Sequence, residues 1–86
     1  MKNTQLTNLT ITKKAGAFGD YFIIYDNDNN EAYFVFANKL KNNSLWNELQ
    51  TKSNTIKQLW LEYEKLEKGN QVTNLEIIDK EEEFFI

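Results

Sequence analysis

The sequence predicts a mostly β domain with one short helix, its elements following in the order β-β-β-α-β-β. Three observations indicate this class: segments that alternate apolar and polar residues, clusters of Gly and Asn between them, and one stretch with apolar residues at helical spacing. The 86 residues suffice for one domain, and 41% of them are apolar and 14% aromatic, which is enough for one core.

The first half of the chain predicts three strands. Residues 9–13 alternate apolar with polar side chains, and residues 15–19 carry two glycines that suit a turn. Residues 21–25 and 32–37 are rich in aromatic and β-branched residues, and an Asp/Asn cluster separates them. We therefore expect these last two strands to form a β-hairpin.

The second half predicts a helix followed by two strands. Ser44 can cap a helix of about ten residues, in which Leu45, Trp46 and Leu49 recur at helical spacing. Residues 55–65 then alternate as a strand does, although the end of this stretch would also suit a helix by propensity. Residues 72–79 alternate again and form the last expected strand.

The order and spacing of these elements over residues 6–79 resemble the OB-fold, a partly open five-stranded Greek-key barrel. The resemblance involves no diagnostic motif, and SH3-like barrels and open α+β sheets share much of it. We expect a single domain of residues 1–86. Within it, residues 6–79 form an OB-like five-stranded antiparallel barrel, and residues 80–86 form an acidic-aromatic tail.

The hairpin loop decides which side chains of its two strands face the core. A five-residue loop buries Phe22, Ile24, Phe34 and Phe36 together. The side chains that then face outward are Tyr21, Ile23, Tyr25, Tyr33 and Val35. A four-residue loop would reverse the faces of the third strand and place Phe34 and Phe36 beside the Tyr row.

An outward row of aromatic side chains on strands two and three is where OB-folds stack single-stranded bases. We therefore expect single-stranded nucleic acid as the ligand, with Trp60 extending the row because Leu59 and Leu61 face inward. The expected binding residues are Tyr21, Tyr25, Tyr33, Trp60, Lys13, Lys14 and Lys57. Lys39 and Lys41 can add positive charge.

The composition argues against catalysis and cofactors. The chain has neither Cys nor His, so the usual nucleophile, general base and metal ligands are missing. We expect no enzyme activity, no cofactor and no metal. The net charge of −3, with every cation a Lys, works against nucleic acid. The alternative is a small acidic protein-binding inhibitor or adaptor, of the kind phages and mobile elements encode, acting as a nucleic-acid mimic. Both hypotheses, nucleic-acid binding and protein binding, are compatible with a homo-oligomer.

The acidic cluster between the hairpin strands has part of the spacing of a calcium loop. Asp26, Asp28 and Asn30 match ligand positions one, three and five of an EF-hand. The required Gly and the bidentate Glu are replaced by Glu31 and Ala37, so a hairpin turn is the expectation.

The chain ends in three glutamates followed by apolar residues. The tail residues of interest are Glu81, Glu82, Glu83, Phe84 and Phe85. This acidic-aromatic ending is similar to the C-terminal tip of bacterial single-stranded-DNA-binding proteins, which implies partner recruitment; here Glu replaces Asp, Pro is missing and the last residue is Ile86. The alternative is a sixth edge strand that covers the barrel opening.

The segment of residues 1–12 has no continuous apolar stretch of the kind signal peptides carry, and no apolar run approaches the length of a membrane span. We expect a cytoplasmic protein without a membrane partner.

Overall fold

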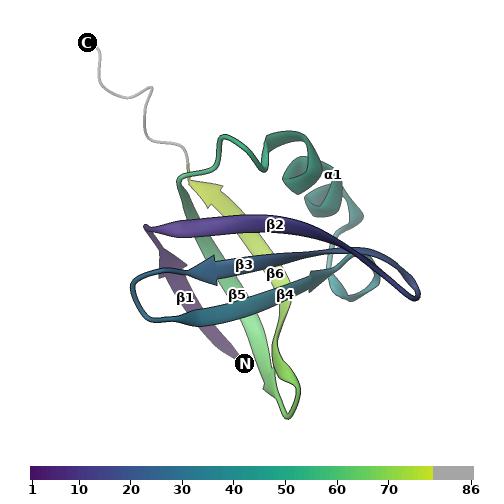
Figure 1. The fold of residues 1–86 in the computed structure, drawn as a ribbon, viewed down its shortest axis with the longest axis horizontal. Helices are drawn as coiled ribbons and strands as arrows, with labels where there is room; N and C mark the ends of the chain where they lie inside the picture. The colour runs from purple at the N-terminus through teal and green to yellow at the C-terminus, as the bar shows by residue number, and fades with distance from the viewer. Residues whose placement is uncertain (79–86) are drawn as a thin grey trace.

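The computed structural model describes residues 1–78 and confirms a mostly β architecture with one α-helix (Figure 1). The strands are β1 (Lys2–Leu6), β2 (Leu9–Gly16), β3 (Gly19–Asp26), β4 (Glu31–Phe36), β5 (Gln58–Leu66) and β6 (Gly69–Ile78). Between β4 and β5 lie a 3-10 turn, η1 (Ala37–Lys39), and the helix α1 (Asn43–Lys52). The described helices include none that is long and apolar enough to cross a membrane.

The six strands form one mixed sheet in the order β1-β5-β6-β4-β3-β2. Neighbouring strands are antiparallel, except for a short parallel pairing of β4 with β6 through Tyr33 and Phe34 opposite Asn70 and Gln71. The predicted five-stranded antiparallel barrel is therefore wrong in detail. The sequence KNTQL of β1 buries only Leu6, so it gave little strand signal, and the hydrogen bonding of the sheet does not close between β1 and β2.

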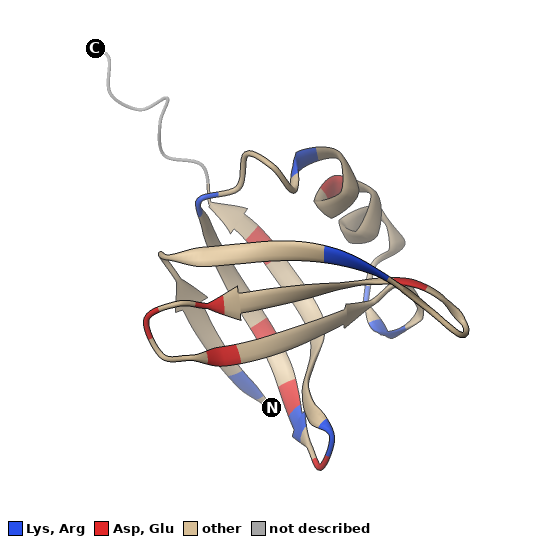
Figure 2. Ribbon diagram, in the orientation of Figure 1, with Lys and Arg blue, Asp and Glu red and all other residues tan. Residues whose placement is uncertain are grey.

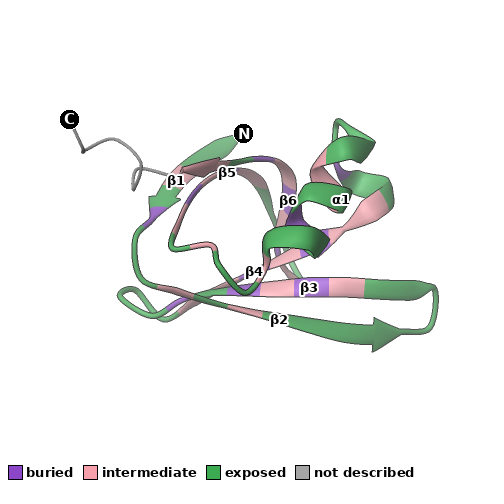
Figure 3. Ribbon diagram, turned by 90° about the horizontal axis from the view of Figure 1, so that it is seen from above, coloured by how far each residue is buried: buried purple, intermediate pink, exposed green. Residues whose placement is uncertain are grey.

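The sheet curls so that β2, β3 and β4 lie across β1, β5 and β6, with the core between the two groups (Figures 1 and 3). Leu59 and Leu61 of β5 are fully buried, as predicted. The helix closes the core from the side: Leu49 is fully buried, and the ring of Trp46 lies 5.0 Å from that of Phe22. Burial of large rings and aliphatic side chains supplies most of the stability of such a small domain.

The hairpin of β3 and β4 has the shorter of the two loops considered from the sequence. Asp26 pairs with Glu31, so residues 27–30 form a four-residue loop. As a result Tyr33 and Val35 face the core, at 4% and 0% exposure, whereas Phe34 is only partly buried and lies outside. The prediction that Phe34 and Phe36 are core residues and that Tyr33 is exposed is wrong, because a loop one residue shorter reverses every side chain of β4.

The helix begins two residues earlier than a Ser44 cap predicts, because its N-cap is a different residue. Asn42 is the N-cap, and its side-chain oxygen accepts a hydrogen bond from the backbone N–H of Ser44 at 3.0 Å. Ser44 also donates its hydroxyl to the same oxygen at 2.9 Å. Asn is as good an N-cap as Ser, so the sequence alone did not separate the two.

Candidate functional site

An aromatic strip covers the outer face of β3 and β4. It comprises Tyr21, Ile23, Tyr25, Phe34 and Phe36, all of which lie on the side of the sheet away from the core. Tyr21 pairs with Phe36 across the two strands, and their ring centroids are 5.3 Å apart. The four-residue loop thus replaces the predicted Tyr33 and Val35 with Phe34 and Phe36, so the strip has one hydroxyl fewer than the sequence predicted.

Two rings of this strip lie directly against glycines of neighbouring strands. A Cβ built on Gly16 would come within 3.2 Å of the Tyr21 ring, and one built on Gly69 would come within 2.8 Å of the Phe34 ring. The rings therefore rest on backbone that has no side chain beneath them. A side chain at either glycine would therefore have to displace the ring.

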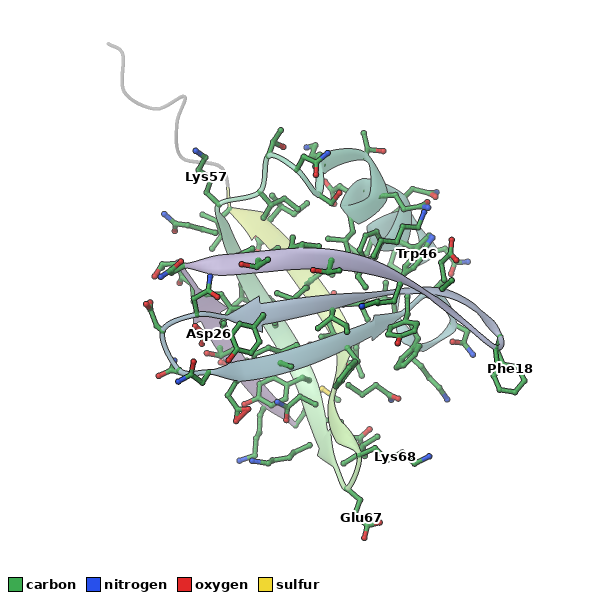
Figure 4. All side chains as sticks on the ribbon, viewed as in Figure 1. Phe18, Asp26, Trp46, Lys57, Glu67 and Lys68 are labelled. Carbon is green, nitrogen blue, oxygen red and sulfur yellow. The ribbon has the colours of Figure 1, made fainter. Side chains whose placement is uncertain are left out.

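A groove of about 870 Å³ runs over one end of the strip, between the tips of the β2–β3 and β5–β6 hairpins. Tyr21, Phe34 and Phe36 lie among its lining residues. Phe18, at the β2–β3 tip, and Leu66, at the other hairpin, also line it and are 104% and 43% exposed. Figure 4 shows Phe18 projecting from one hairpin tip and Lys68 from the other. Each wall of the groove thus offers an exposed apolar side chain.

The charge on this groove is positive. Its charged lining residues are Lys39, Lys68 and Asp20, and the carboxylate of Asp20 lies 3.5 Å from the ammonium of Lys13. Lys14 pairs with Tyr21 in the sheet, so it lies on the same outer face. The other end of the β3–β4 hairpin, at its loop, is acidic (Figure 2). The two ends of this hairpin therefore carry opposite charge.

That acidic end is built as a turn. The buried carboxylate of Asp26 accepts hydrogen bonds from the backbone N–H of Asp28 at 3.0 Å and from the side-chain amide of Asn29 at 2.9 Å. Asn30 adopts a φ of 57°, which Asn tolerates. Within residues 1–78 no group of three His, Cys, Asp or Glu side chains could hold a metal ion. The predicted hairpin turn is confirmed.

The structure separates the predicted binding residues into different regions. Tyr33 lies in the core, where its ring packs edge-on against Tyr63 at 5.0 Å. Burial, together with the nearby Tyr63 and Glu31, raises the pKa of Tyr33 from 10.0 to about 12. A buried ring is not accessible to a base, so the inclusion of Tyr33 in an exposed platform is wrong.

Trp60 faces outward, as predicted, but on the other half of the sheet. It pairs with Gln5 of β1 and Glu76 of β6, and no strand of the β2–β4 group adjoins it. Lys57 precedes β5 at the far end of the molecule from the groove (Figure 4). Lys13 pairs with Phe22, on the inner side of β2. Of the predicted residues, the structure brings together Tyr21 and Lys14 beside the groove, with Tyr25 further along the strip.

Besides Phe34 and Phe36, which were predicted to face the core, sequence reasoning missed the lining residues Phe18, Leu66 and Lys68. Phe18 is the only large apolar residue in the predicted Gly turn, and a lone aromatic at such a place was the one available signal. The approach of the β5–β6 tip to β4 depends on the parallel pairing, which no local pattern encodes. The tail residues Glu81, Glu82, Glu83, Phe84 and Phe85 lie outside the described residues.

Comparison of the chain with protein-family models, with curated proteins and with solved structures finds no match.

Proposed function

We propose that the protein binds single-stranded nucleic acid in the groove between the β2–β3 and β5–β6 hairpin tips. The observation that carries the proposal is the gathering of Tyr21, Phe34 and Phe36 in a groove with two lysines, Lys39 and Lys68, that form no ion pair within residues 1–78. Rings offer stacking surfaces to any base, and lysines beside them neutralise phosphates.

An OB-type fold is part of the same proposal, and strand order supports it. The two end strands of the sheet, β1 and β2, are consecutive in the chain and separated only by Thr7 and Asn8. If β1 and β2 are taken as one bent first strand, the sheet has five strands. This first strand then pairs with the second, β3, on one side and with the fourth, β5, on the other. OB-folds bind oligonucleotides on the face of strands two and three, between the first and last hairpin loops. The groove occupies the corresponding place, over β3 and β4 between the β2–β3 and β5–β6 turns.

The overall charge of −3 opposes binding, so the local arrangement of charge matters. Asp26 and Asp28 lie beyond the far end of the strip and would repel a phosphate there. Lys14, Lys39 and Lys68 are exposed at the groove end. A bound strand is therefore expected to cross the hairpin at its basic end rather than follow it towards the acidic loop, which makes the site short.

A salt titration of binding tests this function. Fluorescently labelled oligo(dT) of about 12 nucleotides should bind at low ionic strength, and the affinity should fall as salt rises. Lys39→Gln and Lys68→Gln should each lower the slope of log affinity against log salt by about 0.7, the value for one phosphate contact to a single strand. The matched control Lys57→Gln removes the same charge far from the groove and should leave the slope unchanged.

Tyr21→Ala and Tyr25→Ala provide a second matched pair on one strand. Tyr21 lines the groove, so its loss should weaken binding by about 1–3 kcal/mol, the usual worth of a base stacked on an aromatic ring. Tyr25 lies outside the groove, and its hydroxyl bonds to Asn30 at 3.1 Å. Its loss should change affinity much less. No binding of oligo(dT) at low salt, or equal effects of the two variants, would refute the proposed site.

A further inference from the structure

A second surface, distinct from the groove, lies on the outer face of β1 and β5. Trp60 is partly buried there, between Gln5 of β1 and Glu76 of β6. Alternation along β5 places Glu62 and Glu64 on the same face. The ammonium of Lys41 lies 3.2 Å from Glu62, which offsets one of these carboxylates. The face therefore combines one large ring with an excess of negative charge.

This face adjoins a strand edge that is open for pairing. Within the part of the chain that the structure describes, β1 pairs with β5 alone, so its other edge presents backbone N–H and C=O groups without a sheet partner. β1 has one charged residue, Lys2 at its start, and the residues that follow it, Asn3, Thr4 and Gln5, are uncharged. The opposite edge of the sheet, β2, carries Lys13 and Lys14. Charged residues, Lys above all, discourage the addition of a strand at an edge, so β1 is the more receptive of the two edges.

We propose that the β1 edge binds an extended, basic segment of a partner protein, which adds as a strand beside β1 and presents cationic side chains to Trp60 and Glu62. Strand addition supplies main-chain hydrogen bonds, and the alternate side chains of the added strand supply specificity. The same basic segment would be repelled by Lys13 and Lys14 at the β2 edge, so charge also decides which edge is used.

The distances in a sheet suit this arrangement. Neighbouring strands lie about 4.8 Å apart, so an added strand would lie about 10 Å from β5, with β1 between them. An Arg side chain extending over Gln5 can meet the indole of Trp60 at that separation, in the range where a cation is attracted to the ring face. Asn3 pairs with Glu62, so a Lys or Arg of the added strand opposite Asn3 lies in line with that carboxylate and can extend over Asn3 towards it. An acidic segment would be repelled by Glu62 and should not bind.

An alternating Arg-Thr octapeptide serves as the probe, with a Glu-Thr octapeptide as its charge-reversed control. Trp46→Phe leaves Trp60 as the only tryptophan, so its fluorescence reports this face alone. We expect the basic peptide to change Trp60 emission in a saturable way and the acidic peptide to have no effect. Gln5→Lys should weaken binding about tenfold, because it places a cation beside Trp60, and Gln5→Glu should strengthen it by a similar factor.

Two further measurements separate strand addition from simple charge attraction. A version of the basic peptide with alternate backbone nitrogens methylated keeps its charge and cannot form the ladder of hydrogen bonds. Loss of binding with this peptide supports strand addition, and unchanged binding overturns it. Sedimentation of the free protein provides the other measurement. A monomer is expected, whereas a dimer that Asn3→Lys, at an exposed position of β1, dissociates would assign the β1 edge to a second copy of the chain and overturn the proposal.

Discussion

The outer face of β3 and β4 and the outer face of β1 and β5 belong to one sheet and carry aromatic side chains in very different settings. On the first, Tyr21, Phe34 and Phe36 share a groove with Lys39 and Lys68. On the second, a single Trp60 lies among amides and carboxylates. An exposed ring does not by itself indicate a ligand, because the charges beside it determine whether a polyanion or a basic segment is attracted.

The largest expected effect tests which side of the sheet is the core. Leu61 is fully buried, so Leu61→Ala should destabilise the protein by about 2–5 kcal/mol. Phe34 is only partly buried on the outer face, so Phe34→Ala should cost about 1 kcal/mol, in keeping with the smaller area removed from water. Denaturant unfolding measures both. Equal losses for the two variants would mean that Phe34 is a core residue and that the outer strip is not a surface.

A pair of glycine variants tests the floor of the groove. Gly19 and Gly69 both have positive φ, at 121° and 142°, so alanine at either is strained by about 1–3 kcal/mol. A Cβ on Gly19 meets nothing within 4 Å, whereas one on Gly69 meets the Phe34 ring at 2.8 Å. Gly69→Ala should therefore cost more than Gly19→Ala and should also weaken oligo(dT) binding. If the two variants are equally stable, Phe34 does not lie against Gly69.

The smallest expected effect concerns pH and the interior side of β4. The pKa of Tyr33 is raised to about 12 in the folded protein, so its neutral form contributes stability that is fully present below pH 10. This contribution is lost as the pH rises from the unfolded value of 10 towards 12. The Tyr33→Phe variant has no ionisable group at this position. Its free energy of unfolding should therefore fall less than that of the wild type between pH 10 and pH 12. Denaturant midpoints measured at several pH values would show the difference, and identical pH dependence would place Tyr33 in water.

Much of the fold was predictable from local patterns. The alternation in β2, β3, β5 and β6 and the Asp/Asn turn gave their approximate places, and Leu59 and Leu61 were assigned to the correct side. The strand β1 was missed because its polar sequence buries only Leu6. The face of β4 depended on a single loop residue, which composition does not determine when every candidate is Asp or Asn.

The candidate site was less predictable, since it depends on long-range pairing. Tyr21 and Lys14 were identified from the sequence, because both lie on strands with a clear alternation. Trp60 also lies on the outer side as predicted, yet the strand order places β6 between its strand and β4. Lys68 and Leu66 reach the groove only because β6 starts beside β4 in a parallel pair. No spacing along the chain indicates that approach.

Fluorescence from single tryptophans on the two faces is the most direct test of the groove as the nucleic-acid site. One protein carries Trp46→Phe and retains Trp60, and the other carries Trp46→Phe, Trp60→Phe and Phe18→Trp, which places the only indole at the wall of the groove. Oligo(dT) added at low salt should change the emission of the second protein and leave Trp60 of the first unaffected. Quenching of Trp60 without any change at the groove wall would contradict the proposed function and locate the nucleic acid on the acidic face.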